Sequence, residues 1–450
     1  MISALTPLWK NENNKDISKF KSLSFPAQAE NQNNNMDVLK IATAGSVDDG
    51  KSTLIGRLLY DTNSLAEDKI EAIRNSSQKK GYDYLDFSLA TDGLVAEREQ
   101  GITIDVAHIY FSTPKKSYII ADTPGHVEYT RNMVTGASTS QVAIILIDAR
   151  KGVMEQTYRH FFVNNLLRTK EVIVAVNKMD LVGYDQSVFE DIKRNFEKLN
   201  ANSTYEEQNV HYIPVSALMG DNVVEESEEM PWYNGVTLLD HLEDLETIDV
   251  NDEGQMRFSV QTVIRPKTEA FHDFRGFAGK IKGGSLQVGD EILVLPSMTS
   301  SKVKEIFFHD TSYQKASAGS SVTLTLEDEV NIARGDMLVK SDELPKIEKE
   351  LNATVCWMDN KELLAGSRFV LQHNTNQVLS KISEVGNIIA TDFSGSMESK
   401  GGLALNEIGE VKIRLSKLVY VDSYKENKSN GAFILIDEQS NTTAGVGFIR

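Results

Sequence analysis

A phosphate-binding loop is the clearest chemical signal in the sequence. Residues 45–52 fit the pattern G-x-x-x-x-G-K-[ST] and lie between the apolar run 38–44 and the helical pattern 53–60. Glycines let backbone N–H groups and a helix N-terminus surround the oxygens of a phosphate. Lys51 adds a cation for the β- and γ-phosphates, and the Ser52 hydroxyl is a ligand for Mg²⁺. The predicted phosphate site comprises Gly45, Ser46, Val47, Asp48, Asp49, Gly50, Lys51, Ser52 and Thr53.

A second motif on the phosphate side follows the apolar run 118–121. It consists of Asp122, Thr123, Pro124, Gly125 and His126. In P-loop enzymes an acidic residue at the end of a neighbouring strand acts on Mg²⁺, directly or through water. Gly125 can bring a backbone N–H close to the γ-phosphate. Taken alone, this pattern also fits an ordinary turn after a strand.

A third motif predicts recognition of guanine. Residues 177–180 follow the apolar run 172–176, and the carboxylate of Asp180 can accept two hydrogen bonds from a guanine edge. Adenine cannot donate that pair, so it would leave a buried charge unpaired. The apolar stem of Lys178 can cover the base. A backbone N–H from residues 216–218 would face the guanine carbonyl, although that tripeptide alone also fits a loop. The predicted guanine site comprises Asn177, Lys178, Met179, Asp180, Ser216, Ala217 and Leu218.

These motifs need a sheet to position them, and the surrounding pattern predicts one. Short apolar runs alternate with helical patterns, which is typical of parallel strands joined by helical crossovers. Phe189, Ile192, Phe196 and Leu199 recur at helical spacing and are expected on one buried face. The apolar runs are residues 38–44, 118–121, 142–147, 172–176 and 212–215.

The pattern changes near residue 250, where helical periodicity fades and short β-type runs begin. Regular short strands separated by turn residues indicate small β-barrels or sandwiches. The runs are residues 258–264, 291–295, 321–326, 354–357, 411–415 and 432–436. We therefore predict an α/β P-loop domain with a mainly parallel, doubly wound sheet, followed by two small β-barrel domains. The expected boundaries are a flexible tail at 1–35, the GTP-binding domain at 36–250, and barrels at 251–343 and 344–450, joined near Glu343.

Composition narrows the function. The 450 residues are 40% hydrophobic and 25% charged, without an apolar stretch of the length a membrane span needs or a signal-peptide core at the N-terminus, so we expect a cytoplasmic protein without a membrane partner. The formal net charge of −18 argues weakly against a nucleic-acid partner. The single cysteine, Cys356, is expected to be a small buried hydrophobic residue. The acidic run 225–229 is expected to be a solvated loop.

Over residues 38–450 these motifs resemble the translational GTPases. Residues 96–105 are similar to the first switch of that family, and the switch comprises Gly101, Ile102, Thr103, Ile104 and Asp105. The resemblance implies GTP and Mg²⁺ as cofactors, with Thr103 binding Mg²⁺ only when the γ-phosphate is present. It also implies that His126 orients the attacking water. Lys51 and Thr103 are the two other catalytic residues that the resemblance implies. An imidazole at that position can polarise a nucleophile at neutral pH, and a structural histidine is the alternative.

A further set of segments distinguishes among members of that family. They are residues 45–49, without the histidine that elongation factors usually carry after the glycine, and residues 230–233, 263–266, 273–279, 288–290, 294–297, 431–437 and 441–443. Together they are similar to the large, GTP-hydrolysing subunit of bacterial sulfate adenylyltransferase. That resemblance implies coupling of GTP hydrolysis to the formation of adenylylsulfate and pyrophosphate from ATP and sulfate, in sulfate assimilation. It places adenylyl transfer on a separate small catalytic subunit.

Two other functions stay open at this point. One is an elongation-factor-type GTPase that delivers aminoacyl-tRNA, and the other is a stand-alone regulatory GTPase. Some relatives carry a fused adenylylsulfate kinase, which would need its own phosphate loop. The 450 residues contain no second G-x-x-x-x-G-K-[ST] pattern, so kinase activity is not expected.

Overall fold

The computed structural model describes residues 37–79, 81, 84–90, 106–123, 130–246, 254–266, 274–308, 311–399 and 401–450. Residues 1–35, the first switch at 101–105, and Pro124, Gly125 and His126 lie outside these ranges. Val38–Arg450 forms one structural unit. It contains an α/β domain followed by two β-barrels, as the sequence predicts.

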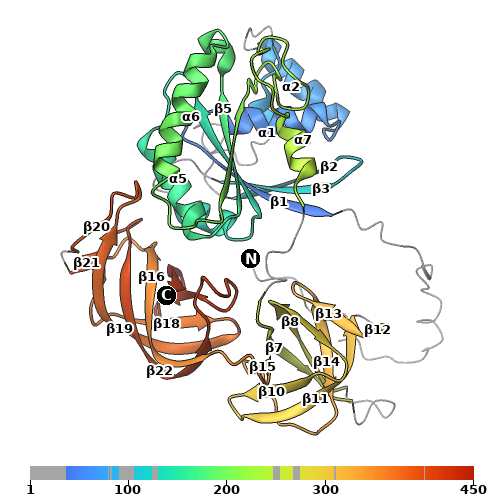
Figure 1. Cartoon of the computed structure of the whole chain (residues 1–450), viewed down its shortest axis with the longest axis vertical. Coiled ribbons are helices and arrows are strands. Elements are labelled where there is room, and N and C mark those ends of the chain that lie inside the picture. Colours follow the sequence, from blue (N-terminus) through green and yellow to red (C-terminus); the bar gives the residue numbers. More distant parts are fainter. Residues whose placement is uncertain are drawn as a thin grey trace. The chain divides into compact units, whose positions relative to one another are not determined.

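A single sheet forms the centre of the α/β domain (Figure 1). Its order among the described residues is β2-β3-β1-β4-β5-β6, and every neighbouring pair is parallel except β2 and β3. The predicted, mainly parallel sheet is therefore confirmed. The strands are β1 (Val38–Ala44), β2 (Ala107–Ser112), β3 (Ser117–Asp122), β4 (Val142–Asp148), β5 (Glu171–Asn177) and β6 (Asn209–Pro214).

Helices cover both faces of this sheet because successive strand residues point to opposite sides. In β1, Ile41 packs in a cluster with Leu54 of α1, whereas the adjacent Ala42 packs in a cluster with Phe161 of α5. α1 and α7 supply apolar residues to one face, and α4, α5 and α6 supply them to the other. The helices are α1 (Lys51–Asp61), α2 (Glu67–Lys79), α4 (Thr130–Ala137), α5 (Glu155–Leu166), α6 (Gln186–Asn200), α7 (Leu238–Asp244) and the short 3₁₀ turns η2 (Phe87–Ala90) and η4 (Met179–Val182).

Two details of the predicted α/β domain are also confirmed. Phe189 and Phe196 of α6 are buried, together with the other two residues of the predicted helical face. The acidic residues of the run 225–229 are exposed. Among the described residues, no helix is long and apolar enough to cross a membrane.

The first barrel is a closed ring of strands. Its order is β10-β15-β7-β8-β14-β11, and pairing of β10 with β11 closes the ring. β12 extends β11, and β9 pairs with β13. The strands are β7 (Arg257–Ile264), β8 (Gly276–Lys282), β9 (Ser285–Gln287), β10 (Glu291–Leu295), β11 (Thr299–Phe308), β12 (Thr311–Tyr313), β13 (Lys315–Ser317), β14 (Ser321–Leu326) and β15 (Met337–Lys340).

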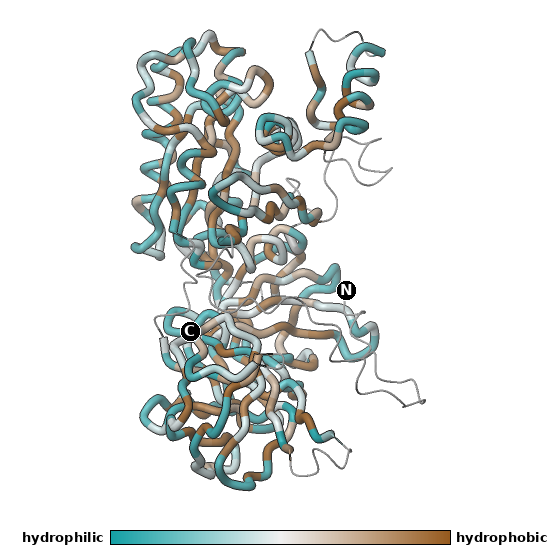
Figure 2. Tube along the Cα trace, turned by 90° about the vertical axis from the view of Figure 1, so that its right-hand side faces the viewer, coloured by the Kyte–Doolittle hydropathy of each residue, from teal (hydrophilic) through white to brown (hydrophobic). Residues whose placement is uncertain are grey.

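The second barrel closes in the same way. Its order is β18-β23-β24-β16-β22-β19, and β18 pairs with β19 to complete the ring. Buried and exposed residues alternate along the first part of β19. The tube in Figure 2 changes between hydrophobic and hydrophilic colours along the described parts of the chain. The strands are β16 (Lys346–Trp357), β17 (Leu363–Leu364), β18 (Arg368–His373), β19 (Asn376–Ile389), β20 (Ser396–Met397), β21 (Gly402–Leu403), β22 (Ile408–Val421), β23 (Ala432–Ile436) and β24 (Thr443–Ile449).

Two strands of the second barrel are longer than their sequence patterns predict. The pattern covers only residues 354–357 of β16 and 411–415 of β22. Their pairing register shifts between Glu348 and Glu350, so the strict two-residue period breaks at that bulge. The sequence pattern therefore predicts only a part of each strand, on one side of the bulge.

The outward side of β16 meets the α/β domain. Trp357 is buried in the core of the second barrel, while its neighbour Cys356 packs in the cluster that contains Phe161 of α5. Phe393 adds to this contact, with ring centroids 5.7 Å from Phe161 and 5.1 Å from Phe162. Cys356 is fully buried, as predicted, and burial raises the pKa of its thiol to about 12.

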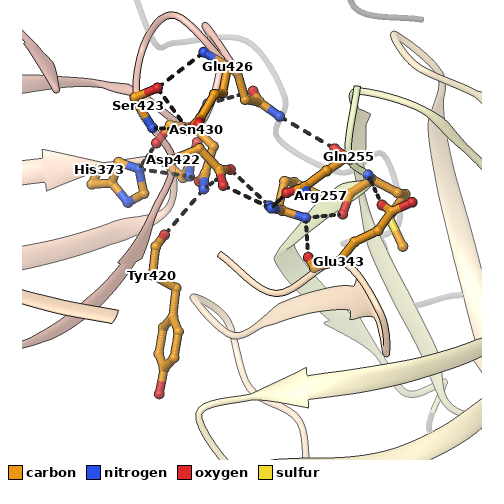
Figure 3. Close-up of polar contacts among 12 residues, drawn as sticks. Gln255, Arg257, Glu343, His373, Tyr420, Asp422, Ser423, Glu426 and Asn430 are labelled. Carbon is orange, nitrogen blue, oxygen red and sulfur yellow. Dashed lines mark hydrogen bonds and ion pairs between the residues drawn. The ribbon is translucent and has the colours of Figure 1, made fainter. Parts of the chain in front are cut away.

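A buried ion pair joins the two barrels (Figure 3). Arg257 at the start of β7 is fully buried, and its Nε and Nη2 each donate to one carboxylate oxygen of Asp422, both at 2.8 Å. Its Nη1 donates to the carbonyl oxygens of Met256 at 3.0 Å and Glu343 at 2.7 Å, and its Nη2 also donates to Gln255 Oε1. The guanidinium thus has a partner for each of its N–H groups, which a buried charge requires.

The carboxylate side of this pair is equally well supported. Asn430 Nδ2 donates to Asp422 at 2.7 Å, and the carbonyl oxygen of Asn430 accepts a hydrogen bond from His373 Nε2 at 2.8 Å. Burial lowers the pKa of His373 to about 4, so the ring is neutral at pH 7. A neutral ring with its proton on Nε2 matches the carbonyl acceptor.

Removal of one member of this pair is expected to be costly. Asp422→Ala leaves the Arg257 charge buried without its partner, which typically costs about 3–5 kcal/mol. Urea unfolding followed by tryptophan fluorescence, to which the buried Trp357 contributes, measures the change. Lys425→Ala, an exposed change in the same loop, is the control and should stay within about 0.5 kcal/mol. Equal midpoints for the two variants would contradict the expected role of the pair.

Candidate nucleotide-binding site

The loop between β1 and α1 has the backbone that its glycine pattern predicts. Asp48 and Gly50 adopt left-handed conformations, with φ angles of 68° and 95°. A Cβ atom on Gly50 would lie 2.4 Å from Asn177 Nδ2, so both the backbone angle and the space favour glycine. The Asp49 carboxylate accepts a hydrogen bond from Ser46 N at 2.6 Å, which fixes the turn from within.

Lys51 lies inside this loop. Its side chain is buried, and Nζ donates to the carbonyl oxygen of Gly45 at 3.0 Å. Burial lowers the pKa of Lys51, while nearby carboxylates, first that of Asp122, act to raise it. An anion bound at the loop would stabilise the protonated form of Lys51, because its negative charge would compensate for the water that burial removes from the ammonium.

Asp122 lies at the same edge of the sheet as the loop. It is buried at the end of β3, directly beside Thr43 of β1 in the parallel register. Thr43 Oγ1 donates to Asp122 Oδ1 at 3.1 Å, and Thr123 Oγ1 donates to the Thr43 carbonyl oxygen at 2.5 Å. These bonds fix the direction of the carboxylate relative to the strand that leads into the loop.

Asn177 connects the loop to the predicted guanine segment. It is buried at the end of β5, where its Nδ2 donates to the carbonyl oxygen of Asp49 at 2.8 Å. Its Oδ1 accepts a hydrogen bond from Ala217 N at 2.9 Å. One amide side chain therefore sets the spacing between two segments that are far apart in the sequence.

Asp180 and Ser216, which belong to two separate motifs, lie in direct contact. Ser216 Oγ donates to Asp180 Oδ1 at 2.7 Å, and Met219 N donates to Ser216 Oγ at 3.2 Å. Arg57 of α1 holds the same segment, because its guanidinium donates to the carbonyl oxygens of Ala217 and Leu218. These contacts orient the Asp180 carboxylate and hold the segment that carries Ser216.

The motifs do not include Asp148, at the end of β4. Its carboxylate accepts hydrogen bonds from Lys178 Nζ at 2.9 Å and from Arg150 Nη2 at 2.6 Å. Burial alone would raise the pKa of Asp148, but these hydrogen bonds outweigh it and keep the pKa below its usual range. Lys178 Nζ also donates to the carbonyl oxygen of Asp48, so Asp148 helps to hold this lysine over the loop. The only sequence signal for this role is an acidic residue at a strand end.

Several predicted site residues belong to segments that the structure does not describe. Thr103 and the rest of the first switch, with Pro124, Gly125 and His126, are outside the described ranges. The described site therefore consists of the phosphate loop, Asp122 and Thr123, residues 177–180 and residues 216–218.

Comparison with known proteins covers most of the chain. The family model for the elongation factor Tu GTP-binding domain matches residues 36–248, and the model for the GTP-eEF1A C-terminal domain-like family matches residues 350–450. The crystal structure of sup35 complexed with GMPPNP covers 92% of this chain and 94% of its own, at 19% identity and a TM-score of 0.41.

Other relatives share a much higher sequence identity with this chain. The bifunctional enzyme CysN/CysC of Mycobacterium tuberculosis is 46% identical over 92% of this chain and 67% of its own length. Sulfate adenylyltransferase subunit 1 of Colwellia psychrerythraea is 48% identical over 93% of this chain and 89% of its own length. The chain therefore belongs to the sulfate adenylyltransferase subunit 1 family.

Proposed function

We propose that this chain is the GTP-hydrolysing subunit of a heteromeric sulfate adenylyltransferase that acts in the cytoplasm. The observation that carries this proposal is the 48% identity to a subunit 1 protein over 93% of this chain and 89% of that protein. The overall reaction converts ATP and sulfate into adenylylsulfate and pyrophosphate. A mixed anhydride of sulfate and AMP is a high-energy product, so the reaction needs a coupled source of free energy, and GTP hydrolysis supplies it.

In this proposal the phosphate loop binds the β- and γ-phosphates of GTP. The buried Lys51 and the left-handed turn at Gly50, which directs a helix N-terminus toward the loop, support this role. The donor set also fits Mg²⁺, which prefers oxygen ligands. Ser52 and Thr103 would supply hydroxyl oxygens, with Asp122 acting directly or through water. When bound, Mg²⁺ neutralises charge on the phosphates.

The guanine base is assigned to the other half of the site. Asp180 accepts hydrogen bonds from the base edge, and its orientation by Ser216 supports this assignment. Ala217 N already donates to Asn177, so we expect the N–H of Leu218 to face the guanine carbonyl. Asn177, Lys178 and Met179 complete the pocket.

Hydrolysis and coupling are assigned to the switch segments. His126 orients the attacking water, and the γ-phosphate orders the segments around Thr103 and Gly125. Loss of that phosphate would release these segments and change the position of the barrels and of a small catalytic subunit. The direct contact of α5 with the second barrel supports a mechanical route, because Arg159 Nη1 donates to the carbonyl oxygen of Asn406 at 3.1 Å.

An aminoacyl-tRNA-delivering elongation factor is the second candidate, favoured by the elongation factor Tu domain match. The formal net charge of −18 weighs against it, because RNA binding depends on cations that neutralise phosphates. Affinity purification of the chain distinguishes these two candidate functions. The proposed function predicts a small nucleotide-binding subunit among the captured molecules, and the second candidate predicts aminoacyl-tRNA.

Co-expression with the small subunit tests the function directly. We expect pyrophosphate release from ATP and sulfate to increase when GTP is added, because hydrolysis offsets an unfavourable equilibrium. The matched control replaces GTP with a non-hydrolysable analogue, which should bind and give no sustained increase. Equal pyrophosphate release with and without GTP would rule out coupling.

Asp180→Asn should change the base preference from guanine to xanthine. The amide replaces one acceptor oxygen with a donor that faces the 2-amino group of guanine. Loss of such a specific contact typically changes selectivity by about 10² or more. Competition binding with GTP and XTP measures the effect, and Asp191→Asn, an exposed change on α6, is the control. Unchanged affinity for both nucleotides would show that Asp180 does not read the base.

His126→Ala should leave GTP affinity near normal and slow hydrolysis by about 10²–10⁴, because the residue is assigned to the water and not to the nucleotide. Partner-stimulated hydrolysis and GTP-dependent adenylylsulfate formation should fall together. His108→Ala, on the exposed side of β2, is the control and should change neither. Full partner-stimulated hydrolysis in His126→Ala would show that this histidine has only a structural role. Loss of GTP hydrolysis with undiminished adenylylsulfate formation would contradict the proposed coupling.

A further inference from the structure

The outer face of the second barrel carries a row of three cations. Arg368 of β18 is directly opposite Lys381 of β19, and Lys381 is directly opposite Arg414 of β22. All three side chains are exposed, because their neighbours along each strand point into the barrel. We call these residues the basic row; the three strands that carry it are labelled in Figure 1.

This arrangement does not stabilise the isolated barrel. Directly opposite residues of antiparallel strands have Cβ atoms about 4.5–5.5 Å apart, and like charges at that distance are destabilising. Glu350 offsets only one end of the row, where it lies 3.7 Å from Arg414 and 2.9 Å from Lys412. Within the described ranges, Arg368 and Lys381 have no salt-bridge partner. A surface that tolerates this repulsion is well suited to a negatively charged ligand.

Two large, exposed apolar side chains lie on the strands that carry the basic row. Leu379 is the next outward residue to Lys381 along β19 and is 58% exposed. Leu418 lies on β22 beyond Arg414 and is 54% exposed. Together with the cations, these apolar side chains could form an interface in which the apolar residues become buried at the centre and the charges form the polar rim.

We propose that this face docks the small catalytic subunit, through a surface of that subunit that carries carboxylates around an apolar centre. The inference rests on the proposed function, which requires such a partner, and it adds the place and the chemistry of the contact. The basic row would steer the acidic partner during association, and burial of Leu379 and Leu418 would slow its dissociation.

Other occupants fit less well. A nucleic acid would neutralise the basic row, but its phosphate backbone offers nothing to the two leucines. A second copy of this chain, joined through the same face by a two-fold axis, would bring two basic rows together. An acidic, partly apolar protein surface satisfies both parts of the face.

Charge reversal of the two unpaired cations tests the proposal. The row variant is Arg368→Glu with Lys381→Glu, and the control is Lys198→Glu with Lys304→Glu, which changes the net charge equally at exposed sites outside this barrel. Surface plasmon resonance with purified small subunit at several NaCl concentrations gives both rate constants. We expect the association rate of the row variant to fall about tenfold or more, with a weaker dependence on salt, and the control to match the wild type.

A second variant tests the apolar part of the face. Leu379→Ser with Leu418→Ser should increase the dissociation rate about tenfold or more while leaving the association rate near normal. Tyr110→Ser, at a 67% exposed tyrosine of β2 in the α/β domain, is the control. Basal GTP hydrolysis of each variant without the small subunit reports that the site and the fold are intact.

The outcomes separate this inference from the proposed function. If the wild-type chain binds the small subunit and both variants bind equally well, the docking face is wrong and the proposed function stands. If the wild-type chain does not bind the small subunit, both fail. Binding of RNA, or self-association on a sizing column, that the row variant alone abolishes would assign the face to that occupant and overturn the inference.

Discussion

The candidate site depends on the two hydrogen bonds of the Asn177 side chain. Its amide nitrogen holds the carbonyl oxygen of Asp49, and its amide oxygen holds the N–H of Ala217. Because this side chain lies against the loop, a glycine is needed at position 50. The loop, the base segment and the end of β5 are thereby fixed as one rigid frame. A site that is held together by such contacts within the protein has less to order when a nucleotide binds.

The barrels are organised around a different kind of contact. The Arg257–Asp422 pair is buried. Each N–H group of the Arg257 guanidinium donates to a side-chain or carbonyl oxygen, and these acceptors come from both barrels and from the connection at Glu343. Buried ion pairs add little net stability compared with apolar packing, but they penalise alternative arrangements in which the partners separate. The second barrel also contacts α5 through a mainly apolar surface around Phe393. The second barrel thus has a directional, polar contact with the first barrel and an apolar contact with α5. The polar contact restricts the relative orientation of its partners more than the apolar contact does.

Local patterns predicted much of the fold. β1, β10, β14 and β23 match their predicted runs residue for residue, because each is a short run rich in apolar and β-branched residues that is bounded by polar or turn residues. The bulged strands β16 and β22 were predicted only in part. The phosphate and guanine motifs are recognisable in the sequence because each is a short segment with its own chemistry, and their binding roles stay predictions. The roles of Thr103 and His126 stay predictions.

Partnerships between distant residues were not predictable in the same way. Arg257 and Asp422 are 165 positions apart, and neither belongs to a motif. The partnership of Asp148 with Lys178 likewise arises from the order of β4 and β5 in the sheet. A charged residue that is destined for burial looks like a surface residue in a sequence until its partner is known.

The position of Cys356 gives the molecule a natural chemical reporter. It is the single cysteine of the sequence, and it lies within the apolar contact between the α/β domain and the second barrel. Thiol reagents react with the thiolate, which burial suppresses at this site. Any motion that separates the two domains would admit both water and reagent. The rate of alkylation therefore measures how often this contact opens, in the unmodified protein and in each nucleotide state.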